Sequence, residues 1–123
     1  MESLQEQLEK LLDTYATQVR NDVNECCMET AKECGLKLRQ TSPKHKGKYA
    51  KGWAVKEEAS SRNVAQSTWV VWNKKYYYLT HLLEKGHAKR NGTGRVQAFP
   101  HIRDVEKWAQ NELPKRLIDK LGG

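Results

Sequence analysis

A histidine and a glutamate three residues apart, His81 and Glu84, come nearest in this chain to the residue types and spacing of a metal site. Imidazole nitrogens and carboxylate oxygens are ordinary zinc ligands, and His87 or His101 could supply a third. Neither the H-E-x-x-H nor the H-x-x-E-H pattern of zinc peptidases is present, however, and two such residues three apart are common by chance. We therefore expect a solvated or hydrogen-bonded histidine beside a glutamate at a helix end, and no metal site.

Three other catalytic patterns are incomplete. His87, Asn91 and His101 resemble part of an HNH nuclease site, but no acidic residue precedes the first histidine and no second metal-binding half follows. The run Gly92-Thr93-Gly94 lacks the Lys-Ser or Lys-Thr pair of a P-loop. No serine or cysteine is paired by spacing with a base. The sequence therefore predicts neither an enzyme nor a bound cofactor.

The segment from Gly86 to Phe99 is basic and glycine-rich, and it follows three consecutive tyrosines at 76–78. Its polar and basic residues are candidates for contact with a partner: His87, Lys89, Arg90, Asn91, Thr93 and Arg95. Aromatic and cationic side chains together can stack bases and neutralise phosphates, as nucleic-acid-binding proteins do. Alternatively, the lysines solubilise a tether while the tyrosines pack between helix and sheet. No RNP aromatic pair or recognition-helix signature is present to favour the first interpretation.

A long amphipathic helix is predicted for residues 1–35, where apolar residues recur at steps of three and four. Ser3 with Glu6 has the form of a capping box, and Gly35 is expected to be the C-cap. Such a helix is longer than a compact domain of this size needs, so part of it would project or pack against a neighbour. A coiled coil is the alternative, although the apolar spacing drifts from a strict heptad.

Residues 36–52 are expected to form a basic connector without periodic burial. Four of its lysines are named as a possible contact surface: Lys44, Lys46, Lys48 and Lys51.

Residues 53–99 are predicted to hold a small antiparallel sheet, a short helix and the basic loop. Strands at 53–58 and 64–73 would pair across a polar turn, and the run from Trp69 to Trp72 would be buried on both faces or shielded by a partner. A short helix, Tyr76–Lys85, would point Tyr78 and Leu82 inward, with Leu79 and Leu83 as further candidates, and Gly86 would end it. A second hairpin is expected around Asn91-Gly92, with residues 95–99 as its second strand.

A last helix is predicted for residues 100–121, opened by Pro100 and kinked or divided at Pro114. The order of elements predicts one α+β domain over residues 1–123, in which the two long helices cover one face of the sheet.

Composition limits which partners and which cellular compartment are expected for the chain. A hydrophobic share of 37% beside a charged share of 30% indicates a thin core, and the formal charge of +7 favours polyanions or acidic proteins as neighbours. Cys26, Cys27 and Cys34 are an odd number inside a helical pattern, which predicts reduced, buried thiols in a cytoplasm. No apolar run approaches the length of a membrane span, and the start of the chain lacks the pattern of a signal peptide.

A set of short motifs, in order along nearly the whole chain, resembles the neck or tail-completion (head-tail joining) family of siphophages and related prophages. Members carry Ser-Pro-x-x-Thr-Gly-x-Leu, then Tyr-x-x-x-x-Glu-x-Gly followed by Thr or His, then Pro-Phe-Leu or Pro-His-Leu. The residues that anchor the match here are Pro43, Gly47, Glu84, Gly86 and Pro100. Two departures stand out, because Lys46 replaces the usual threonine and Tyr49 stands where a leucine is common.

The resemblance implies a non-enzymatic virion protein that is assembled in the host cytoplasm. Such a protein forms a ring, often of six subunits, between the head connector or adaptor and the tail tube or tail terminator. In that ring the loop from Gly86 to Phe99 would reach an adjacent subunit or the tail end, and lysines facing the lumen would lie along the DNA path. No membrane partner is implied.

Overall fold

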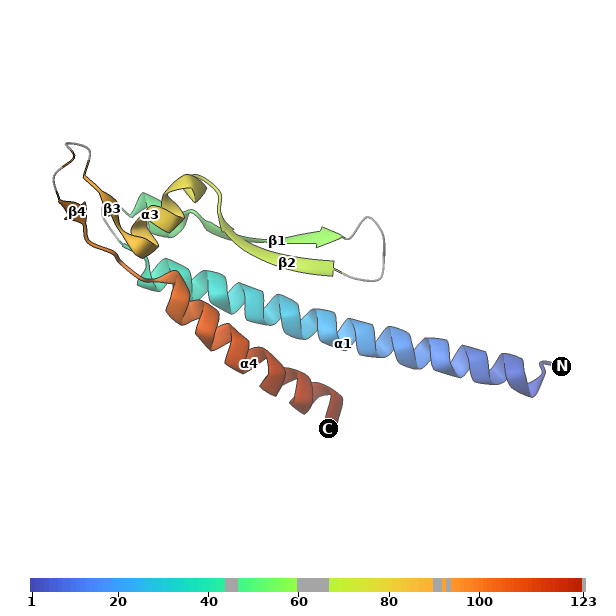
Figure 1. Ribbon diagram of the computed structural model, residues 1–123. Coiled ribbons are helices and arrows are strands. Elements are labelled where there is room, and N and C mark those ends of the chain that lie inside the picture. Colours follow the sequence, from blue (N-terminus) through green and yellow to red (C-terminus); the bar gives the residue numbers. More distant parts are fainter. Residues whose placement is uncertain (44–46, 60–66, 90–91, 93, 123) are drawn as a thin grey trace.

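A 38-residue helix, α1 (Leu4–Thr41), runs along most of the molecule and extends well beyond the other elements at its N-terminal end (Figure 1). The computed structural model describes residues 1–43, 47–59, 67–89, 92 and 94–122. The elements after α1 are these: α2 (Lys48–Lys51), β1 (Trp53–Ala59), β2 (Ser67–Asn73), the 3-10 turn η1 (Tyr77–Leu79), α3 (Thr80–Lys85), β3 (His87–Ala88), β4 (Arg95–Val96) and α4 (Ile102–Gly122). The predicted α+β class is confirmed.

Helix α1 begins as the sequence predicts and ends later. The Ser3 hydroxyl accepts a hydrogen bond from the Glu6 backbone N–H at 3.1 Å, which caps the first turn. Gly35 is not the C-cap: it is buried inside the helix, where a Cβ atom would stand 3.2 Å from Cγ2 of Val55 in β1. The glycine lets the sheet approach the helix, and α1 continues until Ser42 and Pro43 end it.

The predicted connector at 36–52 is wrong for the residues that the structure describes there. Leu38 belongs to α1, and Tyr49 and Ala50 belong to α2; all three are buried. Gly47 precedes α2 with a φ of 73°, a left-handed conformation that favours glycine. The segment therefore supplies core residues while Lys48 and Lys51 remain exposed.

The sheet is an antiparallel hairpin of β1 and β2, in which Trp53 pairs with Asn73 and Val55 with Val71. The face that carries these residues lies on α1, and Trp69 on the same face donates its indole N–H to Oδ1 of Asn24 at 2.8 Å. The run from Trp69 to Trp72 is only half-buried, so the expectation of burial on both faces is wrong within this chain. Residues 60–66, which include the expected turn and strand start, lie outside the described residues.

A second hairpin, predicted around Asn91-Gly92, is confirmed in its strands: His87 pairs with Val96 and Ala88 with Arg95. It is shorter than expected, with two residues in each strand. Asn91 itself lies outside the described residues.

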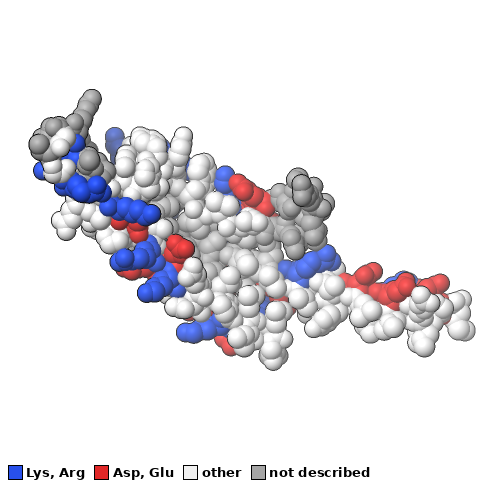
Figure 2. Space-filling view, viewed as in Figure 1, with Lys and Arg blue, Asp and Glu red and all other residues white. Residues whose placement is uncertain are grey.

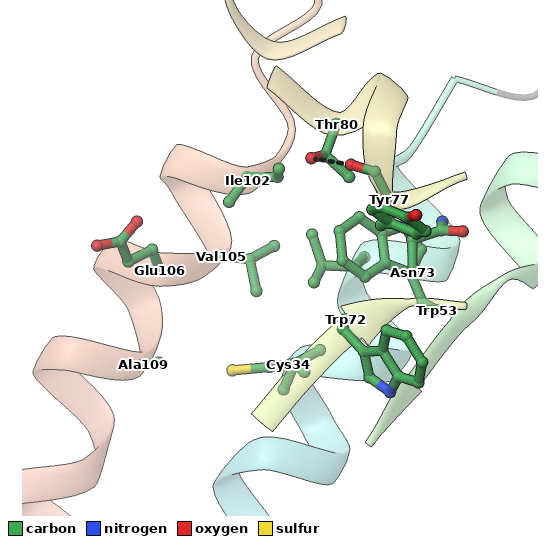
Figure 3. A pocket seen from close by; sticks show the side chains of 12 residues that line it. Cys34, Trp53, Trp72, Asn73, Tyr77, Thr80, Ile102, Val105, Glu106 and Ala109 are labelled. Carbon is green, nitrogen blue, oxygen red and sulfur yellow. Dashed lines mark hydrogen bonds between the residues drawn. The ribbon is translucent and has the colours of Figure 1, made fainter. Parts of the chain in front are cut away.

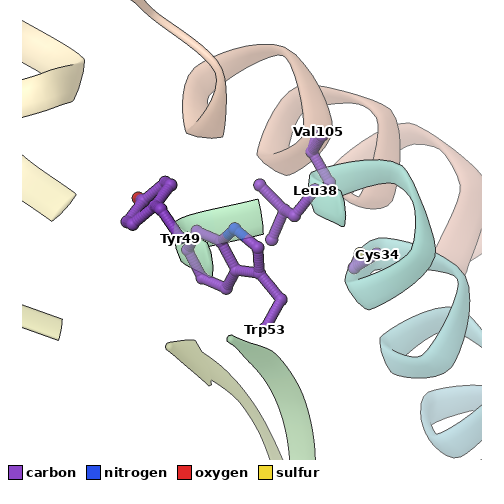
Figure 4. Packing of buried hydrophobic residues seen from close by; sticks show 5 residues of the cluster. All are labelled: Cys34, Leu38, Tyr49, Trp53 and Val105. Carbon is purple, nitrogen blue, oxygen red and sulfur yellow. The ribbon is translucent and has the colours of Figure 1, made fainter. Parts of the chain in front are cut away.

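The core is small and lies where α1, α2, β1 and α4 meet (Figure 4). Its buried apolar side chains are Cys34, Leu38, Tyr49, Trp53 and Val105. Two polar groups beside them illustrate the hydrogen bonding that burial requires. The Trp53 indole N–H donates to Oγ of Ser42 at 2.7 Å, and the Arg39 guanidinium donates to the Trp53 carbonyl at 2.8 Å.

The short helix turns inward the two further candidates, Leu79 and Leu83, but not Tyr78. Tyr76, Leu79 and Leu83 pack against the core, whereas Tyr78 is 55% exposed. Gly86 ends α3 with a φ of 74°, as expected.

Helix α4 lies along α1 and is not divided at Pro114, because the helix continues through that residue to Gly122. Arg116 of α4 donates to the Glu33 carboxylate of α1 at 2.6 Å, and Lys120 pairs with Glu25 at 3.3 Å. Cys26 and Cys34 are buried beside this contact, and Cys27 is partly buried, in agreement with core thiols.

Candidate interaction surface

Glu84, at the end of α3, caps the first turn of α4. Its Oε1 accepts hydrogen bonds from the backbone N–H groups of His101 and Ile102, each at 2.7 Å, and Oε2 accepts from that of Arg103 at 2.9 Å. The first N–H groups of a helix have no partner within it, and a carboxylate there also meets the positive end of the helix dipole. One side chain therefore joins two helices that enclose the predicted loop.

His101 completes this junction beneath the loop. The side chain is buried, with Nε2 2.8 Å from the Tyr49 hydroxyl and Nδ1 2.8 Å from the Phe99 carbonyl oxygen. With the proton on Nδ1, the ring donates to Phe99 and accepts from Tyr49, so both nitrogens have partners. His101 is therefore a structural residue, whereas His81 on α3 is exposed.

The charges at the junction follow from this bonding. Burial alone raises the pKa of Glu84, but the three backbone N–H groups and then His101 outweigh it, so the pKa is lowered overall. Burial, followed by the nearby charge of Glu84, raises the pKa of Tyr49 to about 12. At neutral pH the junction holds an ionised Glu84 and a neutral Tyr49.

The hairpin of β3 and β4 extends from this junction as an arm, which we define as residues 86–99 (Figure 1). The backbone N–H of Phe99 donates to the Leu83 carbonyl at 2.6 Å, which fixes the end of the arm beside its start. Gly92 and Gly94 have φ values of 80° and 79°, so the arm turns through glycines in the left-handed region. The bonded base thus carries two exposed glycines with positive φ, Gly92 and Gly94.

The structure places only part of the predicted contact set. Lys89 and Arg95 are exposed on the arm, and of His87 the backbone alone is described. Arg90, Asn91 and Thr93 lie outside the described residues, as do Lys44 and Lys46 of the former connector. The anchors Pro43, Gly47, Glu84, Gly86 and Pro100 are all described, at the end of α1, the start of α2, the end of α3 and the start of α4.

Positive charge gathers at the arm end of the molecule and negative charge at the projecting end of α1 (Figure 2). Exposed Lys85, Lys89, Arg95 and Arg103 lie on or beside the arm. Glu2 precedes α1, and Glu6, Glu9 and Asp13 lie in its first turns; all four are exposed.

An apolar cleft of about 410 Å³ lies between β2, η1, α1 and α4 (Figure 3). Val71 and Tyr77 line one side, and Ile102, Val105 and Ala109 of α4 line the other. This cleft could not be predicted from the sequence, because its walls come from elements that only the fold brings together.

Among the residues that the structure describes, no group of three His, Cys, Asp or Glu side chains is close enough to hold a metal ion. The described helices also include none that is long and apolar enough to cross a membrane.

Comparison with known proteins gives one family. The model described as "Bacteriophage HK97-gp10, putative tail-component" matches residues 2–86, from the start of α1 to the end of α3. No curated protein and no solved structure matches the chain. The arm beyond Gly86 and all of α4 follow the matched region.

Proposed function

Because this chain belongs to the HK97-gp10-like family of phage tail components, we propose that it is a structural protein of the phage neck that joins heads to tails as a ring. The single observation that carries the proposal is the family match over residues 2–86. As a tail component the protein is part of the virion, and its position at the neck belongs to the proposal. Six is the subunit number expected for the ring.

The architecture supports assembly. A small core leaves α1 projecting and much apolar surface uncovered, as in proteins that complete their burial with neighbours. The exposed arm stands on a base fixed by Glu84 and His101. A loop held on a rigid scaffold is suited to contact a partner.

The partners we propose are further copies of this chain, the head connector or adaptor, and the tail tube or tail terminator. The arm contacts the adjacent subunit or the tail end through Lys89, Arg95 and the neighbouring positions His87, Arg90, Asn91 and Thr93. Exposed lysines that face the lumen contact DNA without sequence preference. The proposal includes no catalytic role.

Light scattering of the purified chain, alone and mixed with the tail tube of the same phage, tests the ring. We expect a discrete assembly of several copies, formed alone or only when the tail tube is present. A monomer under both conditions would contradict the ring.

A stand-alone nucleic-acid-binding module is the second candidate, favoured by the exposed Lys89 and Arg95 on the arm and the net charge of +7. It predicts duplex or single-strand binding that weakens steeply with salt. Replacing both residues with alanine would then lower the slope of log K against log salt by about two, one for each lost phosphate contact. Gln5→Ala and Gln7→Ala, at the projecting end of α1, form the control. An unchanged slope would mean that Lys89 and Arg95 make no phosphate contacts, which would contradict DNA binding through the arm.

A further inference from the structure

The projecting part of α1, residues 1–18, carries an apolar stripe that nothing within the chain's own fold covers. Its members recur at steps of three and four and are between 53% and 82% exposed: Leu4, Leu8, Leu11, Leu12 and Tyr15. Every residue from 1 to 18 is exposed, and burial on α1 begins only with the half-buried Val19. At about 1.5 Å per residue, the helical part, residues 4–18, extends roughly 22 Å beyond the body.

This segment differs in charge from the rest of the chain. It holds four acidic residues and one lysine, a formal charge of −3, while the whole chain carries +7, so residues 19–123 carry +10. A helix that is apolar on one face and acidic on another suits a surface that is apolar at its centre and basic around it. That description fits the opposite end of this same molecule.

The cleft between β2, η1, α1 and α4 supplies the apolar centre. Its volume of about 410 Å³ is in the range that protein pockets use for ligands, so it can take several apolar side chains. Tyr77, which is 63% exposed, stands on its wall. Exposed Lys74 and Lys75 precede Tyr77, while Glu106 is the one carboxylate on the cleft wall among the described residues.

We propose that the projecting segment of α1 docks into the Tyr77 cleft of a second copy of this chain. The contact joins two different surfaces of the molecule, so it is head-to-tail, and repeated head-to-tail contacts close into a ring when the rotation between neighbours allows it. The leucine stripe fills the cleft, and the carboxylates of the segment face the neighbour's lysines. This inference rests on the proposed function, because it names the surface through which ring neighbours meet.

A double substitution tests the stripe. In Leu8→Asp with Leu11→Asp, two stripe residues become charged, and we expect the assembly, with or without the tail tube, to dissociate to monomers. Thr14→Asp with Thr17→Asp is the matched control, because it adds the same charge at the same spacing on another face of the helix. Circular dichroism and thermal melting should show that both variants keep their fold, since none of the four positions is buried.

A cross-link tests the cleft. Leu11→Cys and Tyr77→Cys are introduced separately into a Cys27→Ser chain, which removes the one native thiol that is partly exposed. The mixed proteins should form a disulfide-linked dimer on oxidation, and neither alone should. A disulfide-linked dimer in the Leu11→Cys protein alone, with no additional dimer when the two proteins are mixed, would mean that the apolar stripes of two copies pair with each other. That result would overturn docking in the cleft.

The outcomes separate this inference from the proposed function. A ring that persists in the Leu8→Asp, Leu11→Asp variant overturns the docking surface and leaves the neck function standing. Failure of the unsubstituted chain to assemble under either condition overturns both.

Discussion

Glu84 shows how one side chain can position a whole surface. Its carboxylate accepts three backbone hydrogen bonds from the first turn of α4, although it belongs to α3. Hydrogen bonds to an ionised group contribute more than neutral ones, and the bonded N–H groups would otherwise lose their partner. The base of the arm therefore depends on the charge of Glu84.

Replacing Glu84 with glutamine should lower the free energy of unfolding by about 2 kcal/mol at pH 7, because the amide keeps its shape but loses the charge and one acceptor. The folded-state pKa of Glu84 is lowered, so its contribution is present above about pH 4.5 and is lost as the pH falls through the folded-state value. Denaturant unfolding of both proteins at pH 7 and near pH 3 measures the difference, which should shrink at the lower pH. Glu29→Gln, at an exposed position of α1, is the control. A difference that is equal at both pH values would contradict the capping role.

Tyr49 tests the other half of the junction. Tyr49→Phe removes the hydroxyl that lies 2.8 Å from Nε2 of His101, and about 1 kcal/mol of stability should be lost at pH 8. The pKa of Tyr49 is raised to about 12, so the stability it contributes is complete below about pH 10 and is lost as the pH rises toward 12. The gap between the two proteins should therefore narrow at pH 11. A gap that is the same at pH 11 as at pH 8 would contradict the raised pKa, because a tyrosine with equal pKa values in the folded and unfolded states adds no pH dependence to stability.

Local signals in the sequence were sufficient for some of these residues. Ser3 caps α1 and Gly86 ends α3 with a positive φ, as their neighbours along the chain predict. The partners of Glu84 lie 17 to 19 residues away and those of His101 as many as 52, so nothing in the spacing could identify them. The sequence placed Glu84 at a helix end correctly but could not show which helix it caps.

At the scale of elements, the close approach of backbones explains why the predicted end of the first helix and the predicted connector after it were wrong. Gly35 suggested a helix end, but it is needed where β1 packs on α1, with Val55 against it. The lysine-rich stretch after Gly35 suggested an exposed connector, so the burial of Tyr49 and Ala50 was not predicted. Their burial depends on α2 packing against α1. Charge pattern and glycine position predict loops on average, and tertiary packing overrides them here.

Gly52 offers a test of this packing. A Cβ at this position would stand 2.4 Å from Oδ1 of Asn73, a side chain that is 1% exposed and bonds the Tyr49 carbonyl and the Tyr76 N–H. Gly52→Ala should therefore lower the free energy of unfolding by about 2 kcal/mol despite an ordinary helical φ. Gly122→Ala, where a Cβ meets nothing within 4 Å, is the matched control and should change little. Equal stability of the two variants would contradict the close approach.

At the scale of the whole molecule, the projecting helix should contribute little to the stability of the body. Residues 1–18 are exposed throughout, so a chain that begins at residue 19 should unfold within about 0.5 kcal/mol of the full chain. Thermal melting of the two proteins at equal concentration, under conditions where both are monomeric, measures this. A loss of several kcal/mol would mean that the segment packs on its own body.

The thin core and the overlong helix were both visible in the sequence, because they follow from composition and periodicity. Which side of the molecule the core and the helix leave exposed was not visible in the sequence, because it depends on how far α4 extends along α1. Family membership agrees with the motif resemblance, and the match over residues 2–86 includes four of its five anchors, all but Pro100.

Deletion of this reading frame from the phage that encodes it tests head-tail joining most directly. Electron microscopy of the lysate should show filled heads and complete tails lying separately, and the chain supplied from a plasmid should restore joined particles. Joined, infectious particles in the absence of the protein would contradict its proposed function at the neck.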